Sequence, residues 1–227
     1  MSYNSAHSGV TQLIYNSRKT LLDYLKDQGY NVDDYDDFSI NEVLTMITNN
    51  QLDMLVEKDD EDEFYDDGSK KVDVPKTKAY IKYHLKKSMR PQYIDEFIED
   101  LYNLDNILNK NDTLVIVSKD EPNDSLKKYL KQIFADDNIF VVVLSVKRLQ
   151  FNILNHQLVP PHKKLTKKQT KEFLEKYNIT ESKQIPEISR FDPTALAIGL
   201  KPGRIVHIER PSKTAVVGSY YRYCING

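Results

Sequence analysis

The chain has 227 residues, of which 40% are hydrophobic, so it can bury the core of one or two globular domains. Its single cysteine, Cys224, excludes an internal disulfide, and it has no apolar stretch approaching the roughly 18 residues that span a bilayer, which favours a soluble protein of a reducing compartment. The charge is divided, because residues 1–146 carry 17 Lys+Arg against 28 Asp+Glu (net −11) and residues 147–227 carry 15 against 6 (net +9).

Two amphipathic helices are predicted near the N-terminus. In residues 17–28 three leucines fall on one helical face, and Gly29 is placed to end the helix in a left-handed cap. Ser39 can cap a second helix with its hydroxyl while Glu42 reaches back to the Ser39 backbone, which is the capping-box arrangement. The apolar stripe predicted for this second helix consists of Ile40, Val43, Leu44 and Ile47.

Half-buried strands are predicted on either side of an acidic run. Apolar and polar residues alternate over 52–56 and again over 79–85. The acidic run begins at Asp59 and extends to Asp67, and it predicts a solvated loop. Clustered carboxylates could also hold a hard cation, but the glycine and ligand spacing of a calcium loop is absent.

Helices and unbroken apolar strands then alternate. Pro91 suits the first position of a helix, apolar strands are predicted at 113–117 and 139–144, and a helix between them opens at Ser125. Continuous Val/Ile runs separated by helices predict parallel strands that are covered on both faces. Residues 1–146 are therefore expected to form a three-layer α/β domain with a small, mainly parallel sheet.

A second domain is predicted from residue 147, where the charge becomes basic and the strand–helix alternation stops. Its predicted elements are a helix capped by Thr166 and Gln169, a helix opened by Asp192-Pro193 and ended by Gly199, a Pro-Gly turn at 201–203, and strands at 204–210 and 219–225. Residues 147–227 should form a small mixed helix-plus-hairpin domain. The fold class expected for the whole chain is α+β, with two domains that meet different partners.

No catalytic constellation can be assembled from the sequence. It lacks a Gly-x-Ser-x-Gly nucleophile elbow, and its seven glycines form no phosphate-binding loop. A nuclease alternative would use paired carboxylates and a lysine around magnesium, but Asp53 and Glu57-Lys58 have the wrong spacing. His156 and His162 lack further ligands at metal-site spacing, which favours a structural role for both. We expect no catalytic residue, no cofactor and no metal.

Several motifs in the basic half resemble one known pattern in order and spacing. They are Asn155-His156-Gln157-Leu158-Val159-Pro160-Pro161-His162, Thr166, Gln184-Ile185-Pro186-Glu187-Ile188, Asp192-Pro193, Gly199-Leu200-Lys201-Pro202-Gly203 and Tyr220-Tyr221-Arg222. This pattern is similar to the fifth common subunit of eukaryotic RNA polymerases and to its archaeal counterpart, which consists of the C-terminal module alone. Residues 1–146 resemble the eukaryotic form in length, in element order and in the stretch Lys26-Asp27-Gln28-Gly29-Tyr30.

The resemblance implies a protein without an active site, in which the C-terminal domain packs on the largest polymerase subunit and the N-terminal domain belongs to the lower jaw near downstream DNA. The residues expected at the largest-subunit interface are His156, Val159, Pro160, His162, Asp192, Pro193, Gly203 and Arg222. Capping and turn geometry alone would also explain Asp192, Pro193 and Gly203. The positive charge of this domain suits an acidic partner surface.

For weak contact with downstream duplex DNA, the loop after strand 113–117 is the candidate. The residues expected near DNA are Lys119, Pro122, Ser125, Lys127 and Lys128. Ser125 could open a helix whose free amides attract phosphate, while Asp120, Glu121 and Asp124 in the same loop oppose it. Any contact should be independent of sequence and should depend on the assembled enzyme.

One departure from the family pattern concerns the last turn. Where the family usually has Ser-x-Thr-x-Gly, this chain has Ser212-Lys213-Thr214-Ala215-Val216, and the glycine is displaced to Gly218. The turn is therefore expected to differ. The Asn-, Lys-, Ile- and Tyr-rich composition suggests an AT-rich genome of a protist or a large DNA virus, so the expected location is the nucleus for a cellular protein and the cytoplasm or virion for a viral one.

Overall fold

A computed structural model describes residues 3–59 and 76–227, which form two compact units. One unit contains residues 3–58 and 76–152, and the other contains residues 153–227. Most of the acidic run, from residue 60 onward, lies outside the described residues.

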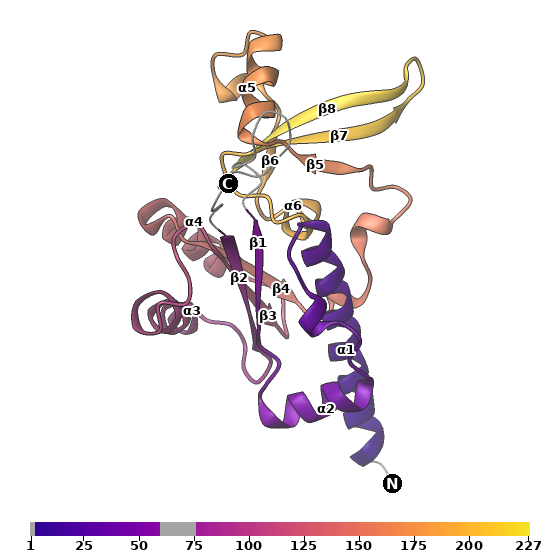
Figure 1. Ribbon diagram of the computed structural model, residues 1–227, viewed down its shortest axis with the longest axis vertical. Helices are drawn as coiled ribbons and strands as arrows, with labels where there is room; N and C mark the ends of the chain where they lie inside the picture. The colour runs from indigo at the N-terminus through magenta and orange to yellow at the C-terminus, as the bar shows by residue number, and fades with distance from the viewer. Residues whose placement is uncertain (1–2, 60–75) are drawn as a thin grey trace. The chain divides into compact units, whose positions relative to one another are not determined.

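The first unit is built on a four-stranded sheet in the order β1-β2-β3-β4 (Figure 1). The strands are β1 (Met54–Asp59), β2 (Lys76–His84), β3 (Thr113–Ser118) and β4 (Phe140–Ser145). β2, β3 and β4 are parallel, with Ile81 opposite Val115 and Val115 opposite Val142. Every residue of β3 and β4 is buried, as expected for strands that are covered on both faces.

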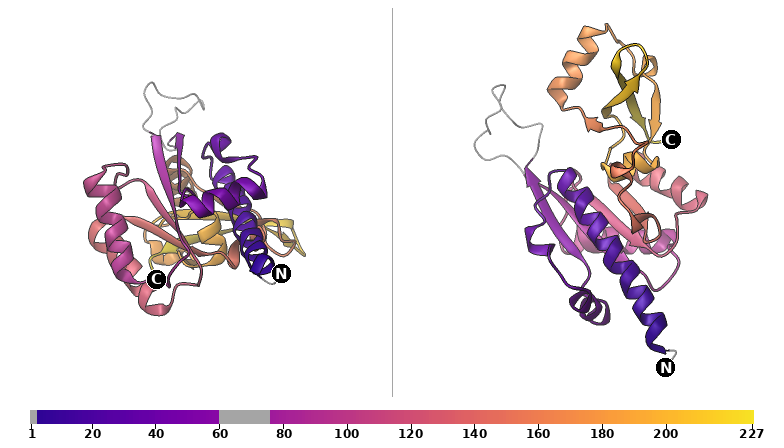
Figure 2. Two further views of the ribbon diagram at one scale, coloured as in Figure 1. Left: turned by 90° about the horizontal axis from the view of Figure 1, so that it is seen from below. Right: turned by 90° about the vertical axis from the view of Figure 1, so that its right-hand side faces the viewer.

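Helices cover both faces of this sheet. They are α1 (Tyr3–Asp27), α2 (Ile40–Asn49), α3 (Pro91–Ile98, continued by a π-helical turn at Glu99–Leu104) and α4 (Asp124–Asp137). Figures 1 and 2 show α1 and α2 on one face and α3 and α4 on the other. The predicted three-layer α/β architecture is confirmed, as are the Ser39–Glu42 capping box and the position of Pro91 at the start of α3.

Two predictions for the N-terminal helices were wrong. α1 begins at Tyr3 rather than near residue 17. Before residue 17 its burial does not follow hydropathy, because Thr11 is buried whereas Val10 and Leu13 are 56% and 46% exposed. In α2 the predicted inward stripe is divided. Val43 is fully buried, whereas Ile40 and Leu44 remain 42% and 41% exposed.

The second unit contains a mixed four-stranded sheet in the order β5-β7-β8-β6. The strands are β5 (His162–Lys164), β6 (Glu187–Ser189), β7 (Ile205–Ser212) and β8 (Val216–Ile225). β7 is antiparallel to both β5 and β8, whereas β6 runs parallel to β8. The long β7–β8 hairpin is therefore the centre of this unit, as the sequence predicted for its last two strands.

A small core forms on each face of this second sheet. α6 (Pro193–Ala197) packs with Val206, Ile208 and Cys224 on one face, and α5 (Lys167–Lys176) packs through Phe173 with Ile205 on the other. The predicted Thr166–Gln169 capping box and the Asp192 cap are both present. The mixed helix-plus-hairpin prediction is confirmed.

Candidate protein and nucleic-acid interfaces

The β7–β8 hairpin extends beyond the strands that flank it. Residues Tyr223–Ile225 of β8 pair with β6, and β5 pairs with only three residues of β7. Within the described part of the chain, the outer edge of β8 from Val216 to Arg222 has no neighbouring strand. Such an edge presents regularly spaced N–H and C=O groups to which a strand of another chain can pair.

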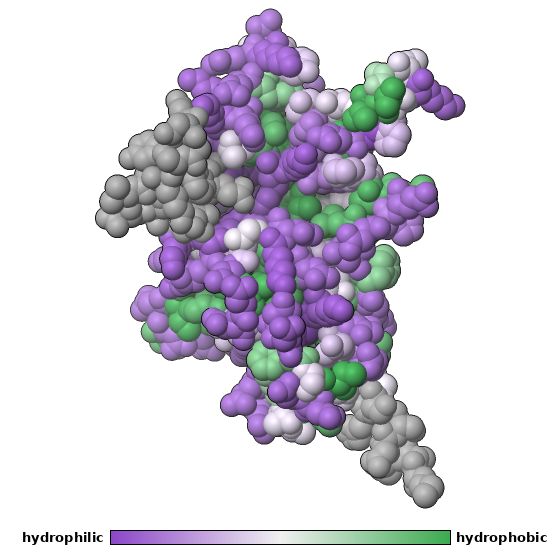
Figure 3. Space-filling view, turned by 45° about the vertical axis from the view of Figure 1, so that its right-hand side comes forward, coloured by the Kyte–Doolittle hydropathy of each residue, from purple (hydrophilic) through white to green (hydrophobic). Residues whose placement is uncertain are grey.

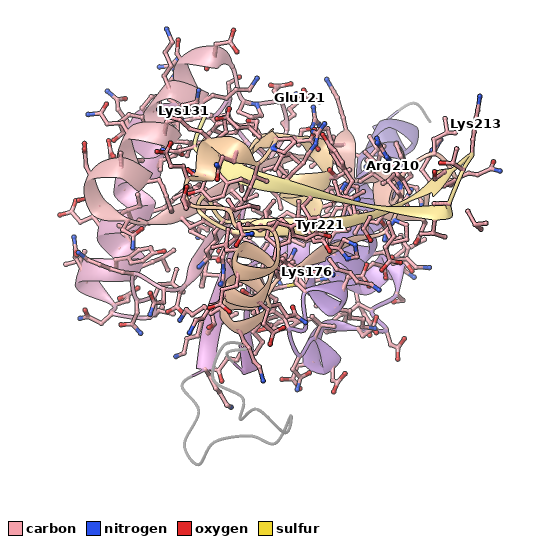
Figure 4. The ribbon with its side chains drawn as sticks, turned by 90° about the horizontal axis from the view of Figure 1, so that it is seen from above. Glu121, Lys131, Lys176, Arg210, Lys213 and Tyr221 are labelled. Carbon is pink, nitrogen blue, oxygen red and sulfur yellow. The ribbon has the colours of Figure 1, made fainter. Side chains whose placement is uncertain are left out.

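Aromatic side chains fix one face of the hairpin to α5. The ring centroid of Tyr221 lies 4.2 Å from that of Phe173 and 4.7 Å from that of His207, with the His207 ring stacked on it. Tyr177 lies 5.1 Å from Phe173 at the end of α5. In Figure 4, Tyr221 on the hairpin lies beside the helix that carries Lys176. These aromatic contacts thus pack the base of the hairpin against α5, while its free end projects beyond them.

Cations and apolar residues gather toward the free end. The guanidinium of Arg210 lies 4.6 Å from the Tyr220 ring centroid, and that of Arg222 lies 5.6 Å from the same ring. Val216 is 83% exposed. Lys213 lies at the far end of the hairpin in Figure 4, and Figure 3 shows hydrophobic atoms on the projecting end at the upper right. An exposed apolar group flanked by cations is suited to an acidic protein partner.

Arg222, one of the predicted interface residues, is half-buried, and its Nε is buried without a hydrogen-bond partner in the part of the chain that the structure describes. Because this Nε is buried within the unit, it does not itself offer a donor to a docking chain.

The segment before β5 forms a second exposed part of this unit. Leu158 is 83% exposed, while its N–H donates to Nδ1 of His156 at 3.2 Å. Val159 donates its N–H to the His156 carbonyl at 2.8 Å, and Nδ1 of His162 lies 2.6 Å from the Pro160 carbonyl. Local hydrogen bonds therefore shape the segment around an outward leucine, and both histidines take part in them.

Three predicted interface residues have clear structural roles. Asp192 accepts hydrogen bonds from the N–H and hydroxyl of Thr194 at 2.9 and 2.6 Å, and Pro193 is the first residue of α6. Gly203 has a φ of 87°, which favours glycine, and donates its N–H to the Cys224 carbonyl at 2.9 Å. Cap and turn geometry accounts for all three.

The buried pair of Arg190 and Cys224 contributes to the core of this unit. Both are at most 2% exposed. Burial raises the pKa of the Cys224 thiol to about 12 and lowers the pKa of Arg190 to about 10. Cys224 is thus a protonated, buried group, and it is not a reactive thiol.

In the first unit, the acidic residues of the loop between β3 and α4, which was predicted to lie near DNA, form ion pairs. Arg148 donates from Nε and Nη2 to the Glu121 carboxylate at 3.1 and 3.3 Å. Lys147 lies 3.8 Å from Asp120, and Lys127 lies 3.4 Å from Asp124. Each acid that opposed a phosphate contact therefore has a basic partner.

The cations around this loop outnumber its acids. Lys119, Lys127, Lys128, Lys147 and Arg148 against Asp120, Glu121 and Asp124 give five positive and three negative charges, a local net of +2. Lys119 and Lys128 are exposed and have no ion pair among the described residues, and Pro122 is half-buried. Figure 4 labels Glu121 in this loop and Lys131 in the helix α4 that follows it.

The expectation that Ser125 opens the following helix was wrong. α4 begins at Asp124, and Asn123 caps it by accepting the Leu126 N–H at 2.8 Å. Ser125 lies inside the first turn. The sequence 123–125 offers three candidate caps in a row, and only the backbone conformation of Asn123 selects one of them.

The acids considered for a nuclease site are bound by other groups. Asp53 accepts hydrogen bonds from Lys82 Nζ at 2.6 Å and from the Tyr83 N–H at 2.9 Å. Glu57 pairs with Lys76 at 3.2 Å and with Lys78 at 3.6 Å. Over the described ranges, no group of three or more His, Cys, Asp or Glu is arranged to hold a metal. No helix within those ranges is long and apolar enough to cross a membrane.

Sequence reasoning missed some contributors to these surfaces. Arg210 and Val217 join the exposed hairpin end, and Arg148 neutralises the loop from a position 27 residues away in the chain. Strand alternation would not have identified Arg210 as exposed, because it shares a face with the buried residues Val206 and Ile208. Nothing in the sequence pairs Arg148 with Glu121.

Comparison with known proteins gives two kinds of match. Residues 151–224 match the family described as "RNA polymerase Rpb5, C-terminal domain". A DNA-directed RNA polymerase subunit Rpo5 of Pyrococcus abyssi is 47% identical over 76 residues, which are 34% of this chain and 92% of that protein. The Rpo5 subunit of Methanococcoides burtonii is 41% identical over 76 residues and is covered over 96% of its length.

One relative extends over both units. The protein named "DNA-directed RNA polymerases I, II, and III subunit rpabc1" of Dictyostelium discoideum is 30% identical over 213 residues, which are 92% of this chain and 95% of that protein. The archaeal relatives match one third of the chain, whereas this eukaryotic relative matches nearly all of it.

Proposed function

The chain belongs to the Rpb5 family of DNA-directed RNA polymerase subunits, and we propose that it is a non-catalytic assembly subunit whose C-terminal domain docks on the largest polymerase subunit. The domain boundary proposed from the charge division lies after residue 146. The free outer edge of β8, flanked by exposed apolar and basic residues, is the observation that carries this proposal.

Docking would use backbone pairing, apolar contact and charge together. A strand of the partner would pair along Val216–Arg222, and Leu158 would provide a separate apolar anchor. Residues 153–227 carry 13 Lys+Arg against 6 Asp+Glu, a net of +7, which favours an acidic surface on the partner. Among the predicted interface residues, Arg222 lies on β8. The segment around Leu158 contains the other four, which are His156, Val159, Pro160 and His162. Asp192, Pro193 and Gly203 would act by shaping the unit.

For the N-terminal domain, a position in the lower jaw near downstream DNA is the accompanying proposal. The local net charge of +2 around Lys119 and Lys128 supports weak attraction to phosphate. The domain carries a net charge of −11 over residues 1–146, so it should not bind DNA when isolated from the enzyme. The contact would be sequence-independent and would form only within the complex.

Co-purification of the full-length chain with the largest polymerase subunit tests the proposal. We expect a stable complex and no nuclease or nucleotidyltransferase activity from the chain alone. Failure to retain the largest subunit would contradict the docking role. A magnesium-dependent nuclease activity that a single carboxylate substitution abolished would contradict the non-catalytic role. The expected location is the nucleus for a cellular protein and the cytoplasm or virion for a viral one.

A further inference from the structure

Arg18 is a buried charge without an acidic partner. It lies on α1 and is 4% exposed. Its Nη1 donates to the Leu52 carbonyl at 3.1 Å, and its Nε has no hydrogen-bond partner within the described part of the chain. No carboxylate of the described residues forms an ion pair with it. A buried guanidinium in this state is costly, because a carbonyl dipole offsets only part of the lost hydration.

The neighbours of Arg18 are aromatic and neutral. Its guanidinium carbon lies 5.9 Å from the ring centroid of Tyr35 and 5.6 Å from that of Phe38. Burial raises the pKa of the neighbouring Tyr83 phenol, so this group stays protonated and offers Arg18 a neutral oxygen rather than a counter-charge. Burial also lowers the pKa of Arg18, although an arginine side chain stays protonated in a folded protein.

A cavity of about 130 Å³ adjoins this charge. Its walls come from α1, from the loop before α2 and from α2 itself, and they consist of Tyr15, Arg18, Lys19, Leu22, Tyr35, Asp36, Asp37, Phe38 and Val43. Asp36 is already paired with Lys26 and also accepts the Asp37 N–H at 3.3 Å. The cavity therefore combines the buried guanidinium of Arg18 with aromatic and apolar walls, and the side chains of Lys19 and Asp37 also line it.

We propose that this cavity receives a carboxylate side chain of a protein partner, with the guanidinium of Arg18 as its counter-charge. A carboxylate carried on methylene groups matches both the cation and the apolar walls. A phosphate ion has no apolar part and would leave the aromatic and apolar walls without a counterpart.

The outer surface of α2 indicates what should surround that carboxylate. Ile40 and Leu44 are one helical turn apart on the helix that supplies Val43 to the cavity wall, and both remain exposed. They offer contact area to apolar residues beside the acid. The expected partner sequence is thus an acidic residue flanked by apolar ones. This inference concerns the first unit alone and does not depend on the docking proposed for residues 153–227.

Side-chain NMR of the full-length protein tests the proposal, with the Arg18 Nε–H signal identified by its loss in Arg18→Met. The probes are glutamate, glutamine and a Leu-Glu-Leu tripeptide, each acetylated and amidated, together with inorganic phosphate at matched ionic strength. We expect a saturable shift of this signal with capped glutamate, none with capped glutamine or phosphate, and tighter binding of the tripeptide.

Two variants test whether the charge of Arg18 itself is needed for binding. Binding is followed in both through the backbone amide signals of residues lining the cavity. Arg18→Met should weaken binding of the tripeptide by at least about tenfold, because it removes the counter-charge. Lys110→Met, which removes an exposed lysine of the same unit, should change it by less than about twofold. Neither variant should affect co-purification with the largest polymerase subunit.

The contrary outcomes are equally definite. Absence of a saturable shift, or equal shifts with glutamate and glutamine, would overturn a carboxylate site. Tighter binding of phosphate would indicate an oxyanion or nucleic-acid site instead. A tripeptide that bound no more tightly than glutamate would overturn the protein partner in favour of a small free acid.

Discussion

Ser212 and Val216 pair across the end of the β7–β8 hairpin, and Val216 has a left-handed backbone with φ of 59°. This is the position at which the family pattern has glycine. Gly218, the displaced glycine, has no positive φ and lies opposite Arg210 within the ladder. A left-handed backbone is thus present where the family has glycine, and a β-branched residue adopts it.

Replacing Val216 by glycine should therefore stabilise the C-terminal unit. Left-handed conformation costs a β-branched residue on the order of 1–3 kcal/mol, and part of the gain is lost to the greater freedom of glycine in the unfolded chain. We expect Val216→Gly to raise the free energy of unfolding by about 1 kcal/mol in urea denaturation. Val217→Gly, the adjacent control, should lower it, because Val217 has no positive φ and loses strand propensity. Equal effects of the two would contradict strain at Val216.

Leu158 should be an anchor for the largest polymerase subunit. Leu158→Asp should reduce its recovery in co-purification at least about tenfold, because a carboxylate would be buried in an apolar contact. The matched control is Leu104→Asp in the first unit, where the leucine is 68% exposed and no docking is proposed. Loss of the complex in both variants, or in neither, would exclude Leu158 as a specific anchor.

Phe173 should be the main attachment of α5 to the hairpin. Its side chain is 9% exposed and contacts Tyr221, so Phe173→Ala should lower the free energy of unfolding of the C-terminal unit by about 3–5 kcal/mol. Tyr177→Ala should cost about 1 kcal/mol, because Tyr177 is 52% exposed. Urea denaturation followed by circular dichroism measures both. A cost for Phe173 as small as that for Tyr177 would mean that α5 is held by other contacts.

The Arg148–Glu121 pair should make the loop between β3 and α4 sensitive to acid. The hydrogen bond from Arg148 lowers the pKa of Glu121 below its ordinary value of 4.5. A lowered folded-state pKa contributes stability that is present above the unfolded pKa and is lost as the pH falls through the folded one. Arg148→Met should return the pKa of Glu121 toward 4.5, as followed by carboxyl-carbon NMR.

Lys147→Met serves as the control for this pair. Lys147 lies 3.8 Å from Asp120 and has a smaller influence on Glu121 than Arg148 does. Its loss should therefore move the pKa of Glu121 less than the loss of Arg148 does. If both variants moved that pKa equally, general charge around the loop would be responsible rather than the hydrogen bond.

The sequence by itself determined the local elements whose causes are local. The Ser39–Glu42 and Thr166–Gln169 capping boxes, the Asp192 cap and the buried strands β3 and β4 all follow from side chains a few residues apart, and the structure has them where they were predicted. The motifs of the C-terminal half were also sufficient to identify the family.

Only the tertiary structure decided which residues from distant parts of the chain come into contact. The Arg148–Glu121 pair, the free edge of β8 and the buried cation at Arg18 depend on distances between segments that are far apart in sequence. α1 was predicted too short for the same reason, because its burial before residue 17 does not follow hydropathy. Propensity and periodicity describe neighbours along the chain, whereas burial and charge pairing are properties of the packed molecule.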